Sequence, residues 1–432
     1  MKKLKAILSY AFISALSGAF AGTLIFIFKM AASYVIHSSV SFYECARENV
    51  EFALLLIFGV ALISLAIYFI LKYFPDCRGG GIPTVIENIK GNVSFNWITT
   101  ILFLPLSALF TFFSGIPLGN EGPSVQLGCA AGKGVASLCK NKDEKREKYI
   151  MTATASAGFA AATGAPFSAV VFAFEEIYRS FSATLLLSSV TSIACATITN
   201  GFLSKLFHSG TRLFSFSVSF SMPLKYVWSA ILVGIAAGVW VLVTELFEKY
   251  ADKILKAINN VSMFPKILVV SLGTALFGLC SKMYVGSGHD LIETIFENRN
   301  FEIWMLVSVL FVRALLLISA NNVGITGGKF LPTLALGAIL GELSARLLIY
   351  MGLMGGEYRT LLVLMGIAAF LGAKSHIPIV ALCFSVEALC GFSNIVHFIV
   401  SIGVSYLFVR IFKAADFSES VIKKNNNLEV DV

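Results

Sequence analysis

A succession of apolar runs separated by brief loops restricts this chain to a helical membrane protein. Hydrophobic residues make up 57% of the sequence and charged residues 13%, which exceeds the apolar content of ordinary soluble domains. Helices suit a bilayer because they satisfy their own backbone groups. We expect helices near 6–36, 52–73, 95–114, 123–138, 149–164, 166–178, 182–203, 224–247, 266–281, 302–319, 332–351, 359–373, 378–390 and 394–412.

Several of these runs are too short to cross about 30 Å of hydrocarbon at roughly 1.5 Å per residue. Short segments interrupted by glycine or proline indicate broken or half-spanning helices. Their ends are tolerated at membrane depth only where they line a cavity or are covered by protein. The sequence therefore predicts an all-α, polytopic membrane protein of broken and tilted helices.

An internal repeat divides the chain into two halves. Three anchors recur in the same order at nearly one spacing, so chance is a poor explanation. The anchors are Gly119–Gly132 with Gly328–Gly341, 209 residues apart; Gly79–Gly81 with Gly286–Gly288, 207 apart; and Pro166 and Glu175 with Pro378 and Glu387, 212 apart.

This duplication predicts one transmembrane transport domain, 1–432, made of two pseudo-repeats. We place the repeats at about 6–215 and 216–424, followed by a short polar tail at 425–432. Duplicated membrane transporters commonly consist of two repeats of inverted topology, with the binding site at their interface near the middle of the bilayer. We expect the glycine-flanked helix starts of both halves to meet there.

Glu121 is the first candidate functional residue, because it places a carboxylate between glycines inside an apolar setting. It directly precedes Pro123, which suits the start of a helix. A helix amino end offers free N–H groups and about half a positive charge, so it attracts anions. Glu121 can occupy such a site as a carboxylate or take up a proton and leave it. Anion and proton traffic would then share one residue.

Three motifs at consistent spacing resemble those of the CLC family of chloride channels and proton-coupled chloride antiporters. They are Gly79–Pro83, Gly119–Pro123 and Gly328–Pro332, within a similarity that runs from about residue 10 to 420. The resemblance implies an inverted-repeat fold of CLC type. It also implies a homodimer in which each subunit has its own anion pathway.

Carried over residue by residue, the resemblance assigns gating to Glu121 and inner proton transfer to Glu176. Glu175 recurs as Glu387 in the second repeat, which indicates that Glu175 is structural and Glu176 functional. Pairing of either acid with Arg179 is the alternative. The implied anion-binding residues are Gly79, Gly80, Gly81, Ile82, Gly119, Asn120, Gly122, Lys329, Phe330, Leu331 and Phe417.

Two departures from the family pattern bear on selectivity. Gly80 stands where the family usually has a serine, and Phe417 where it has a tyrosine, so both hydroxyls expected at the central anion are missing. Binding would then rest on the backbone N–H groups of Lys329 and Phe330 and on an aromatic edge. Asn120 replaces a basic residue common beside the glutamate, while Lys329 adds a positive charge opposite it. Chloride is the default anion.

Charge and cysteine patterns exclude other classes. Lysine and arginine cluster at segment ends, near Lys2, at 140–148 and near Lys423, which predicts a multi-pass cell-membrane protein with both termini cytoplasmic. No basic stripe favours nucleic acid. Eight scattered cysteines without a Cys-x-x-Cys pair predict no metal or cofactor, and His289 is interpreted as a loop residue. We interpret residues 6–36 as an uncleaved first helix, with a signal peptide as the alternative.

The expected function is exchange of chloride or a related anion for protons. Two alternatives use the same fold: a passive anion channel gated by Glu121, and an exporter of fluoride. An intramembrane enzyme is disfavoured, because the sequence has neither His-Glu-x-x-His nor Asp-rich pairs. The partners expected are a small anion, protons, the lipid bilayer and a second copy of the chain.

Overall fold

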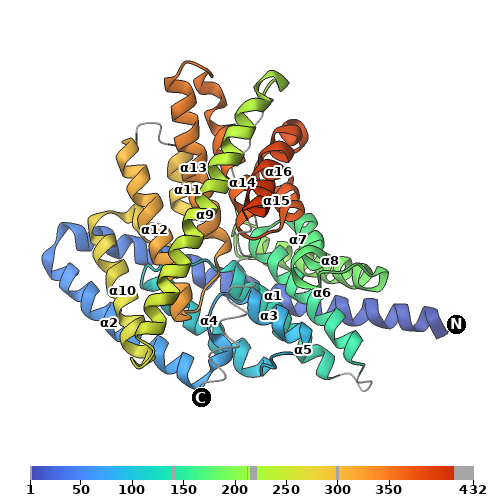
Figure 1. The fold of residues 1–432 in the computed structure, drawn as a ribbon. Helices are drawn as coiled ribbons and strands as arrows, with labels where there is room; N and C mark the ends of the chain where they lie inside the picture. Colours follow the sequence, from blue (N-terminus) through green and yellow to red (C-terminus); the bar gives the residue numbers. More distant parts are fainter. Residues whose placement is uncertain (1, 139–142, 212, 215–220, 298–300, 413–432) are drawn as a thin grey trace.

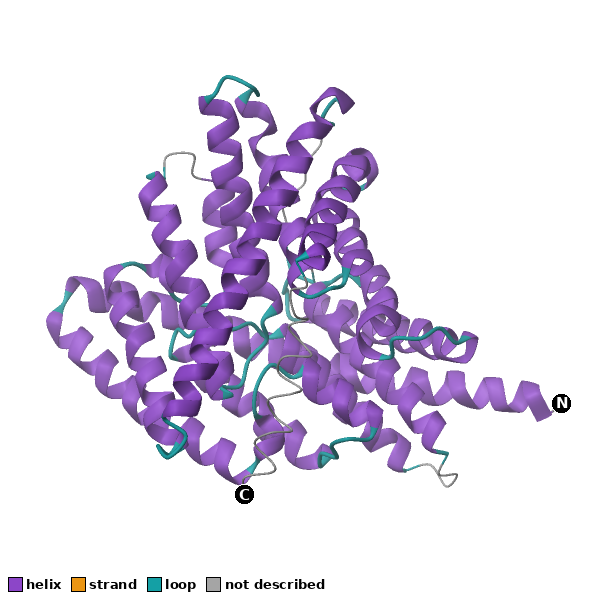
Figure 2. Cartoon of the chain, viewed as in Figure 1, coloured by secondary structure: helices purple, strands orange, loops and turns teal. Residues whose placement is uncertain are grey.

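The described part of the chain is helical throughout. A computed structural model describes residues 2–138, 143–211, 213–214, 221–297 and 301–412. These residues contain no strand, only one isolated bridge between Gly119 and Gly328 (Figure 2). Nine of the described helices are long and apolar enough to cross a membrane. The predicted all-α, polytopic fold is therefore confirmed.

Each half of the described chain contains eight α-helices in the same order (Figure 1). The first half has α1 (Lys2–Glu48), α2 (Val50–Tyr73), α3 (Ile82–Lys90), α4 (Trp97–Phe113), α5 (Glu121–Ser137), α6 (Glu144–Thr163), α7 (Pro166–Phe172) and α8 (Ala183–Leu206). The second half has α9 (Val227–Ala257), α10 (Met263–Cys280), α11 (His289–Glu297), α12 (Ile303–Val323), α13 (Phe330–Tyr350), α14 (Arg359–Lys374), α15 (Pro378–Phe384) and α16 (Ile395–Ile411).

Short turns complete this order. Both α7 and α15 continue into a π-helical turn, at Ala173–Ile177 and Ser385–Cys390. The 3₁₀ turns are Pro75–Cys77, Leu224–Tyr226, Lys282–Tyr284, Gly356–Tyr358 and Phe392–Asn394. The predicted boundary at 215/216 lies outside the described residues.

The structure corrects several helix predictions, and α9 runs to Ala257 rather than ending near 247. Helices α3 and α11 were not expected, because nine residues with a polar face leave no long apolar run. Helix α1 continues past residue 36 to Glu48, and there the hydroxyls of Ser38 and Ser39 donate to the backbone carbonyls of Tyr34 and Phe113, at 2.8 Å each. Helices α5 and α13 begin two residues before their prolines. The missing proline N–H falls within the first turn, where it has no intrahelical partner.

Reciprocal hydrogen bonds relate the two halves by an approximate two-fold axis. Gly119 and Gly328 exchange both backbone bonds, at 2.7 and 2.6 Å. The N–H of Gly79 donates to the carbonyl of Gly324 at 3.0 Å, and the corresponding Gly286 donates to Gly115 at 2.8 Å. Contacts that are their own images under exchange of the halves indicate a two-fold relation, which is compatible with the inverted topology expected from the repeat.

Glu175 and Glu387 form a second reciprocal pair. The carboxylate of Glu175 accepts hydrogen bonds from the N–H groups of Ile379 and Val380, in the first turn of α15, at 3.0 and 2.6 Å. Glu387 accepts equivalent bonds from the second and third residues of α7, both at 2.8 Å. Each acid satisfies N–H groups that its partner helix leaves open. This is the structural role that the repeat predicts for Glu175.

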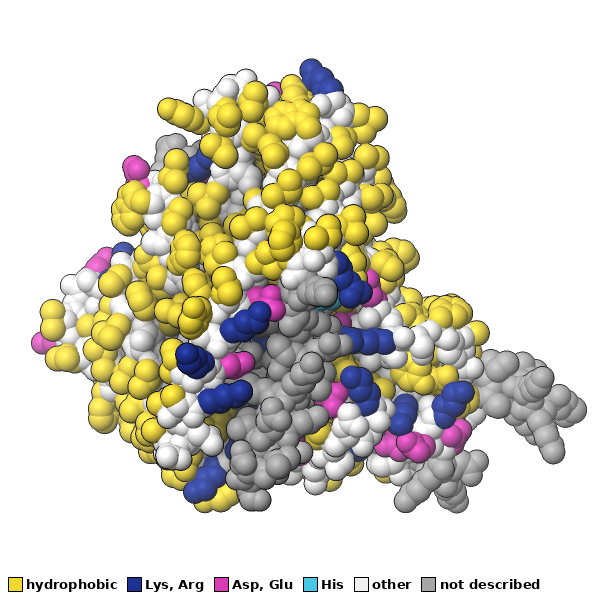
Figure 3. Space-filling view, viewed as in Figure 1, with side chains coloured by type: hydrophobic (Ala, Val, Ile, Leu, Met, Phe, Trp, Pro, Cys, Tyr) yellow, Lys and Arg dark blue, Asp and Glu magenta, His cyan; other side chains and the backbone are white. Residues whose placement is uncertain are grey.

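Small residues let the central helices pack closely. A methyl group at Gly128 of α5 would collide with the carbonyl oxygen of Thr154 in α6, and one at Gly337 of α13 would lie 2.7 Å from that of Gly366 in α14. Helix α5 is almost wholly buried. Large exposed apolar side chains instead line helices such as α1, α2, α8 and α16. Figure 3 shows apolar side chains covering much of one face of the molecule.

Candidate functional site

Three glycine loops meet backbone to backbone at the centre of the molecule. A methyl group at Gly81 would collide with the carbonyl of Gly122. One at Gly122 would collide with the carbonyl of Gly80 and lie 2.8 Å from Cα of Gly328. Figure 2 shows loop segments gathering in this region between the helices. The loops predicted to form the site therefore converge, and only glycine allows their approach.

Backbone geometry and side-chain bonds hold the loops in this arrangement. Gly81 has φ +79°, a conformation that suits glycine. The hydroxyl of Thr326 donates to the carbonyl of Cys77 at 2.7 Å and lies 2.7 Å from the hydroxyl of Ser107. The amide of Gln126 donates to the carbonyl of Asp76, also at 2.7 Å. The loops are thus fixed before any ligand arrives.

Two helix amino ends open at the junction of these loops. Asn120 precedes α5 and Lys329 precedes α13, with nearly equal φ angles of −90° and −100°. Neither side chain caps its helix. The first N–H groups of both helices, including those of Phe330 and Leu331, therefore have no intrahelical partner and favour negative charge.

The carboxylate of Glu121 lies at this junction. Glu121 is 0% exposed, and neither of its oxygens has a hydrogen-bond partner among the described residues. A methyl group at Gly119 would collide with Oε2 of Glu121 and would lie 3.3 Å from Cβ of Leu331. The N–H of Leu331 also interacts electrostatically with the Glu121 carboxylate, but its geometry is not that of a hydrogen bond. A buried carboxylate thus lies at helix ends that attract anions.

Two cations that sequence reasoning did not select act on this carboxylate. Lys29, in the apolar part of α1, and His289, the first residue of α11, both interact electrostatically with Glu121. Lys29 donates to the carbonyl of Thr211 at 3.1 Å, and Nε2 of His289 lies 2.7 Å from that of Leu213. The inter-repeat connection thus contacts both cations, through Thr211 and Leu213. The sequence signal that could have identified Lys29 is a single lysine within an apolar run.

The sequence predicted that His289 lies in a loop. In the structure it is the first residue of α11 and lies near two carboxylates. A carbonyl accepts from its Nε2, so that nitrogen carries hydrogen. Its Nδ1 lies 3.8 Å from Oδ1 of Asp290 and 3.5 Å from Oε2 of Glu293, which favours the doubly protonated ring. The three ligand atoms lie within 4.8 Å of one another. This ionic contact accounts for the cluster, and we assign it no metal.

Glu176 is the second acid that belongs to one repeat only. It lies in the π-helical turn after α7 and is 4% exposed. Arg179 approaches its carboxylate, with Nη2 and Oε2 3.8 Å apart, so the ion pair considered as an alternative is present. The position equivalent to Glu176 in the second repeat is Ala388, and the position equivalent to Glu121 is Phe330. Glu175 is duplicated as Glu387, whereas Glu121 and Glu176 have no acid at the equivalent position.

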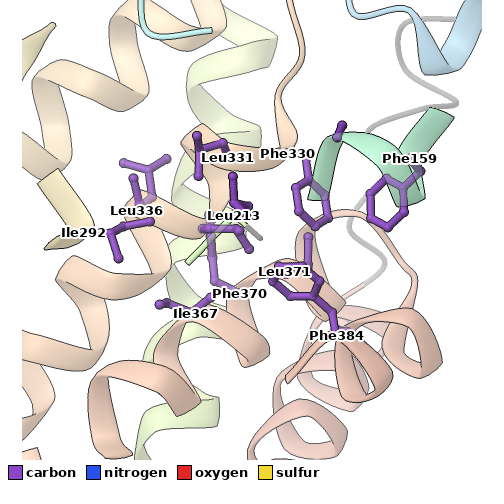
Figure 4. Packing of buried hydrophobic residues seen from close by; sticks show 14 of the residues in the cluster. Phe159, Leu213, Ile292, Phe330, Leu331, Leu336, Ile367, Phe370, Leu371 and Phe384 are labelled. Atoms are coloured by element: carbon purple, nitrogen blue, oxygen red, sulfur yellow. The ribbon is translucent and has the colours of Figure 1, made fainter. Parts of the chain in front are cut away.

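Aromatic rings surround the start of α13. Phe330 packs edge-on against Phe159 and Phe384, with ring centroids 5.1 and 5.2 Å apart. Phe159 also stacks on Phe172 at 4.5 Å. Figure 4 shows Phe159, Phe330 and Phe384 in the same hydrophobic cluster as Leu331. The junction is therefore enclosed by apolar side chains, which strengthens every electrostatic interaction within it.

The remaining candidates differ in how the structure places them. Gly79 lies in the same loop as Gly80, and Ile82 begins α3. Lys329 was expected to add positive charge at the site, and its Cε lies 3.5 Å from the position that a methyl group at Gly80 would occupy. Phe417 lies outside the described residues. The central site is thus formed by backbone from three loops, with Lys329 beside one of them.

The fold and site define a polytopic membrane protein of two inverted helical repeats whose broken helices meet around one buried acid. The chain belongs to the voltage gated chloride channel family, whose model matches residues 59–410. Its structure resembles that of a slow cyanobacterial Cl⁻/H⁺ antiporter, with TM-score 0.84, 20% identity and coverage of 96% of this chain and 97% of the other.

Two further solved structures share the fold. A CLC-type fluoride/proton antiporter gives TM-score 0.77 at 21% identity, covering 93% of this chain and 95% of the other. A eukaryotic CLC transporter gives 0.76 at 16% identity, covering 97% and 74%. At these identities the likeness establishes the fold.

Proposed function

We propose that this protein exchanges chloride, or a related small anion, for protons across the cell membrane. The observation that carries the proposal is the carboxylate of Glu121 at the amino ends of α5 and α13, which is fully buried and accepts no hydrogen bond from the described residues. Family membership and the fold shared with a Cl⁻/H⁺ antiporter support it. The proposal treats the chain as one transport domain.

In this mechanism an anion and the Glu121 carboxylate compete for the same helix ends. The anion exchanges its water for the N–H groups at the starts of α5 and α13. Displaced from this position, Glu121 takes up a proton and loses its attraction to the site. Glu176 passes protons between the cytoplasmic side and Glu121 by a separate route. Counter-movement of an anion and a proton transfers net charge, worth about 2.3 kcal/mol per elementary charge per 100 mV.

Paired flux measurements test this function. In vesicles containing the purified protein, a chloride gradient should drive protons across the membrane even when the pH is initially equal on both sides. Reversing the chloride gradient should reverse the direction of proton movement. A current whose reversal potential ignores pH would instead identify a passive channel. Repeating the assay with nitrate and fluoride identifies the anion, and proton coupling with fluoride alone would favour the fluoride exporter.

Adjacent acids with different surroundings give a matched test of proton transfer. Glu176→Gln should reduce chloride-driven proton flux at least tenfold while anion flux continues, because an amide cannot relay a proton. Glu175→Gln should retain coupling but lower the unfolding free energy by about 1–3 kcal/mol, because it weakens two bonds to α15. Flux assays and thermal unfolding in detergent separate the two effects. Equal loss of coupling in both variants would contradict a specific role for Glu176.

We also propose that the protein is a homodimer with both termini in the cytoplasm. Apolar side chains are exposed at equivalent places in the two repeats, with Phe167 61% and Ile379 57% exposed at the starts of α7 and α15. Large exposed side chains such as Phe202 of α8 and Leu407 of α16 add to the apolar surface of these helices. Crosslinking in native membranes checks this proposal, and a species of one subunit only would contradict it.

A further inference from the structure

Helix α1 passes close to the start of α5, and a lysine lies on the face that meets it. A methyl group at Gly158 of α6 would collide with the carbonyl of Ser124, in the first turn of α5, and would lie 3.2 Å from Cδ1 of Ile25 in α1. Lys29 follows Ile25 by four residues, which is about one helical turn. Residues four apart share a helix face, so Lys29 projects toward the start of α5.

The ammonium group of Lys29 acts on Glu121 from this face. Its electrostatic interaction with the carboxylate is stronger than that of His289. Lys29 is half-buried and donates a hydrogen bond to the carbonyl of Thr211 at 3.1 Å. A carbonyl is a neutral acceptor, so this bond holds the ammonium in place without removing its charge. Lys29 therefore stabilises negative charge at the position that Glu121 occupies.

The residue beside Glu121 in sequence carries no charge. Asn120 is half-buried, and its side chain makes no hydrogen bond to the start of α5. A basic residue is common at this position in the family. In this chain a cation reaches Glu121 from α1 instead, where Lys29 interrupts an apolar run. An ionisable side chain in such a run is costly unless it has a function.

We propose that Lys29 is the cation that Glu121 and the transported anion use in turn, in place of a basic residue at position 120. This inference rests on the proposed function, since it concerns the same anion site. When the Glu121 carboxylate lies at the helix ends, Lys29 stabilises it. When Glu121 is protonated and displaced, Lys29 stabilises the anion there. Loss of Lys29 weakens both competitors, so its full effect on the anion appears only when the carboxylate is absent.

Chloride binding in two backgrounds tests this sharing, with the purified full chain titrated calorimetrically in detergent at neutral pH. In a Glu121→Gln background, Lys29→Met should weaken chloride binding at least tenfold, because the anion alone then depends on the cation. In the original protein the same substitution should change chloride binding less than threefold. Lys29→Arg keeps the charge and should stay within threefold in both backgrounds.

Lys133→Met is the matched control. Lys133 of α5 is also half-buried and donates to a backbone carbonyl, that of Phe95, at 2.8 Å. Its loss should leave chloride binding unchanged in both backgrounds. Equal weakening by Lys29→Met in the two backgrounds would show that Lys29 acts through the fold, and unchanged binding in Glu121→Gln would show that its charge does not act on the anion. Either result would overturn the proposal.

Moving the cation tests whether Lys29 replaces a basic residue at position 120. Asn120→Lys, added to Lys29→Met in the Glu121→Gln background, should restore chloride binding to within about threefold of Glu121→Gln alone. Binding that stays weak would contradict the replacement. If Lys29→Met does not fold, Lys29→Gln, which keeps a hydrogen-bond donor, takes its place under the same criteria.

These outcomes are distinct from failure of the proposed function, because calorimetry measures anion binding without proton movement. A protein that shows the expected dependence on Lys29 but moves no protons in vesicles would refute the exchange mechanism and leave the role of Lys29 standing. Chloride-driven proton flux, together with chloride binding that Lys29→Met leaves unchanged in the Glu121→Gln background, would do the reverse.

Discussion

Replacing Glu121 with glutamine should reduce proton transport at least a hundredfold, while anion transport continues. Glutamine has nearly the volume of glutamate but neither gains nor loses a proton, and it carries no charge to compete for the helix ends. The carboxylate it replaces is fully buried and has no hydrogen-bond partner among the described residues, so little folding energy depends on it. Anion flux in this variant should become independent of pH between about 5 and 8, the range that the proposed exchange would make pH-dependent.

Glu342→Gln is the matched control for this experiment. Glu342 is as completely buried as Glu121 but lies in α13 beside two cations, with Oε1 2.6 Å from Nε of Arg346 and Oε2 2.8 Å from Nε of Arg359. Removing its charge leaves those arginines less well compensated and should lower thermal stability. Proton coupling should survive in the folded fraction. Coupled proton flux that persists in Glu121→Gln would refute the central role given to Glu121.

Much of this architecture could be predicted because it depends on the backbone. Glycines before a helix start are visible in sequence, and their recurrence predicted that the loops at Gly119 and Gly328 would meet. Gly119 and Gly328 exchange backbone hydrogen bonds at 2.7 and 2.6 Å, so the two loops do meet. Glu175 was also predictable, because an acid that caps a helix in both repeats must recur at the same spacing. Its counterpart Glu387 does so.

The charges around the site could not be predicted in the same way. Lys29 and Glu121 are far apart in sequence, and the connection at 211–214 bonds to Lys29 and His289. Nothing in local spacing encodes that path. The stem of Lys329 likewise lies near Gly80, which belongs to another loop. Sequence periodicity predicts where helices begin, whereas these contacts arise only from how the loops pack.

A methyl group at the loop junction should be as damaging as loss of the gating charge. Gly122→Ala would place Cβ against the carbonyl oxygen of Gly80 and 2.8 Å from Cα of Gly328. Both neighbours are backbone, so no side-chain rotation relieves the collision, and the loops must move apart. Overpacking of this kind costs about 1–3 kcal/mol or more. We expect a lower melting temperature and at least tenfold weaker chloride binding.

Gly59→Ala separates this effect from a general sensitivity to added methyl groups. Gly59 lies within α2, and no atom other than the helix's own nearby backbone lies within 4 Å of the position of its added methyl. Alanine there should be neutral or stabilise the helix by up to about 1 kcal/mol, since glycine is the poorer helix former. Chloride titrations and thermal unfolding of both variants make the comparison. If Gly122→Ala bound chloride as tightly as Gly59→Ala, the helix ends would not need this close approach to hold an anion.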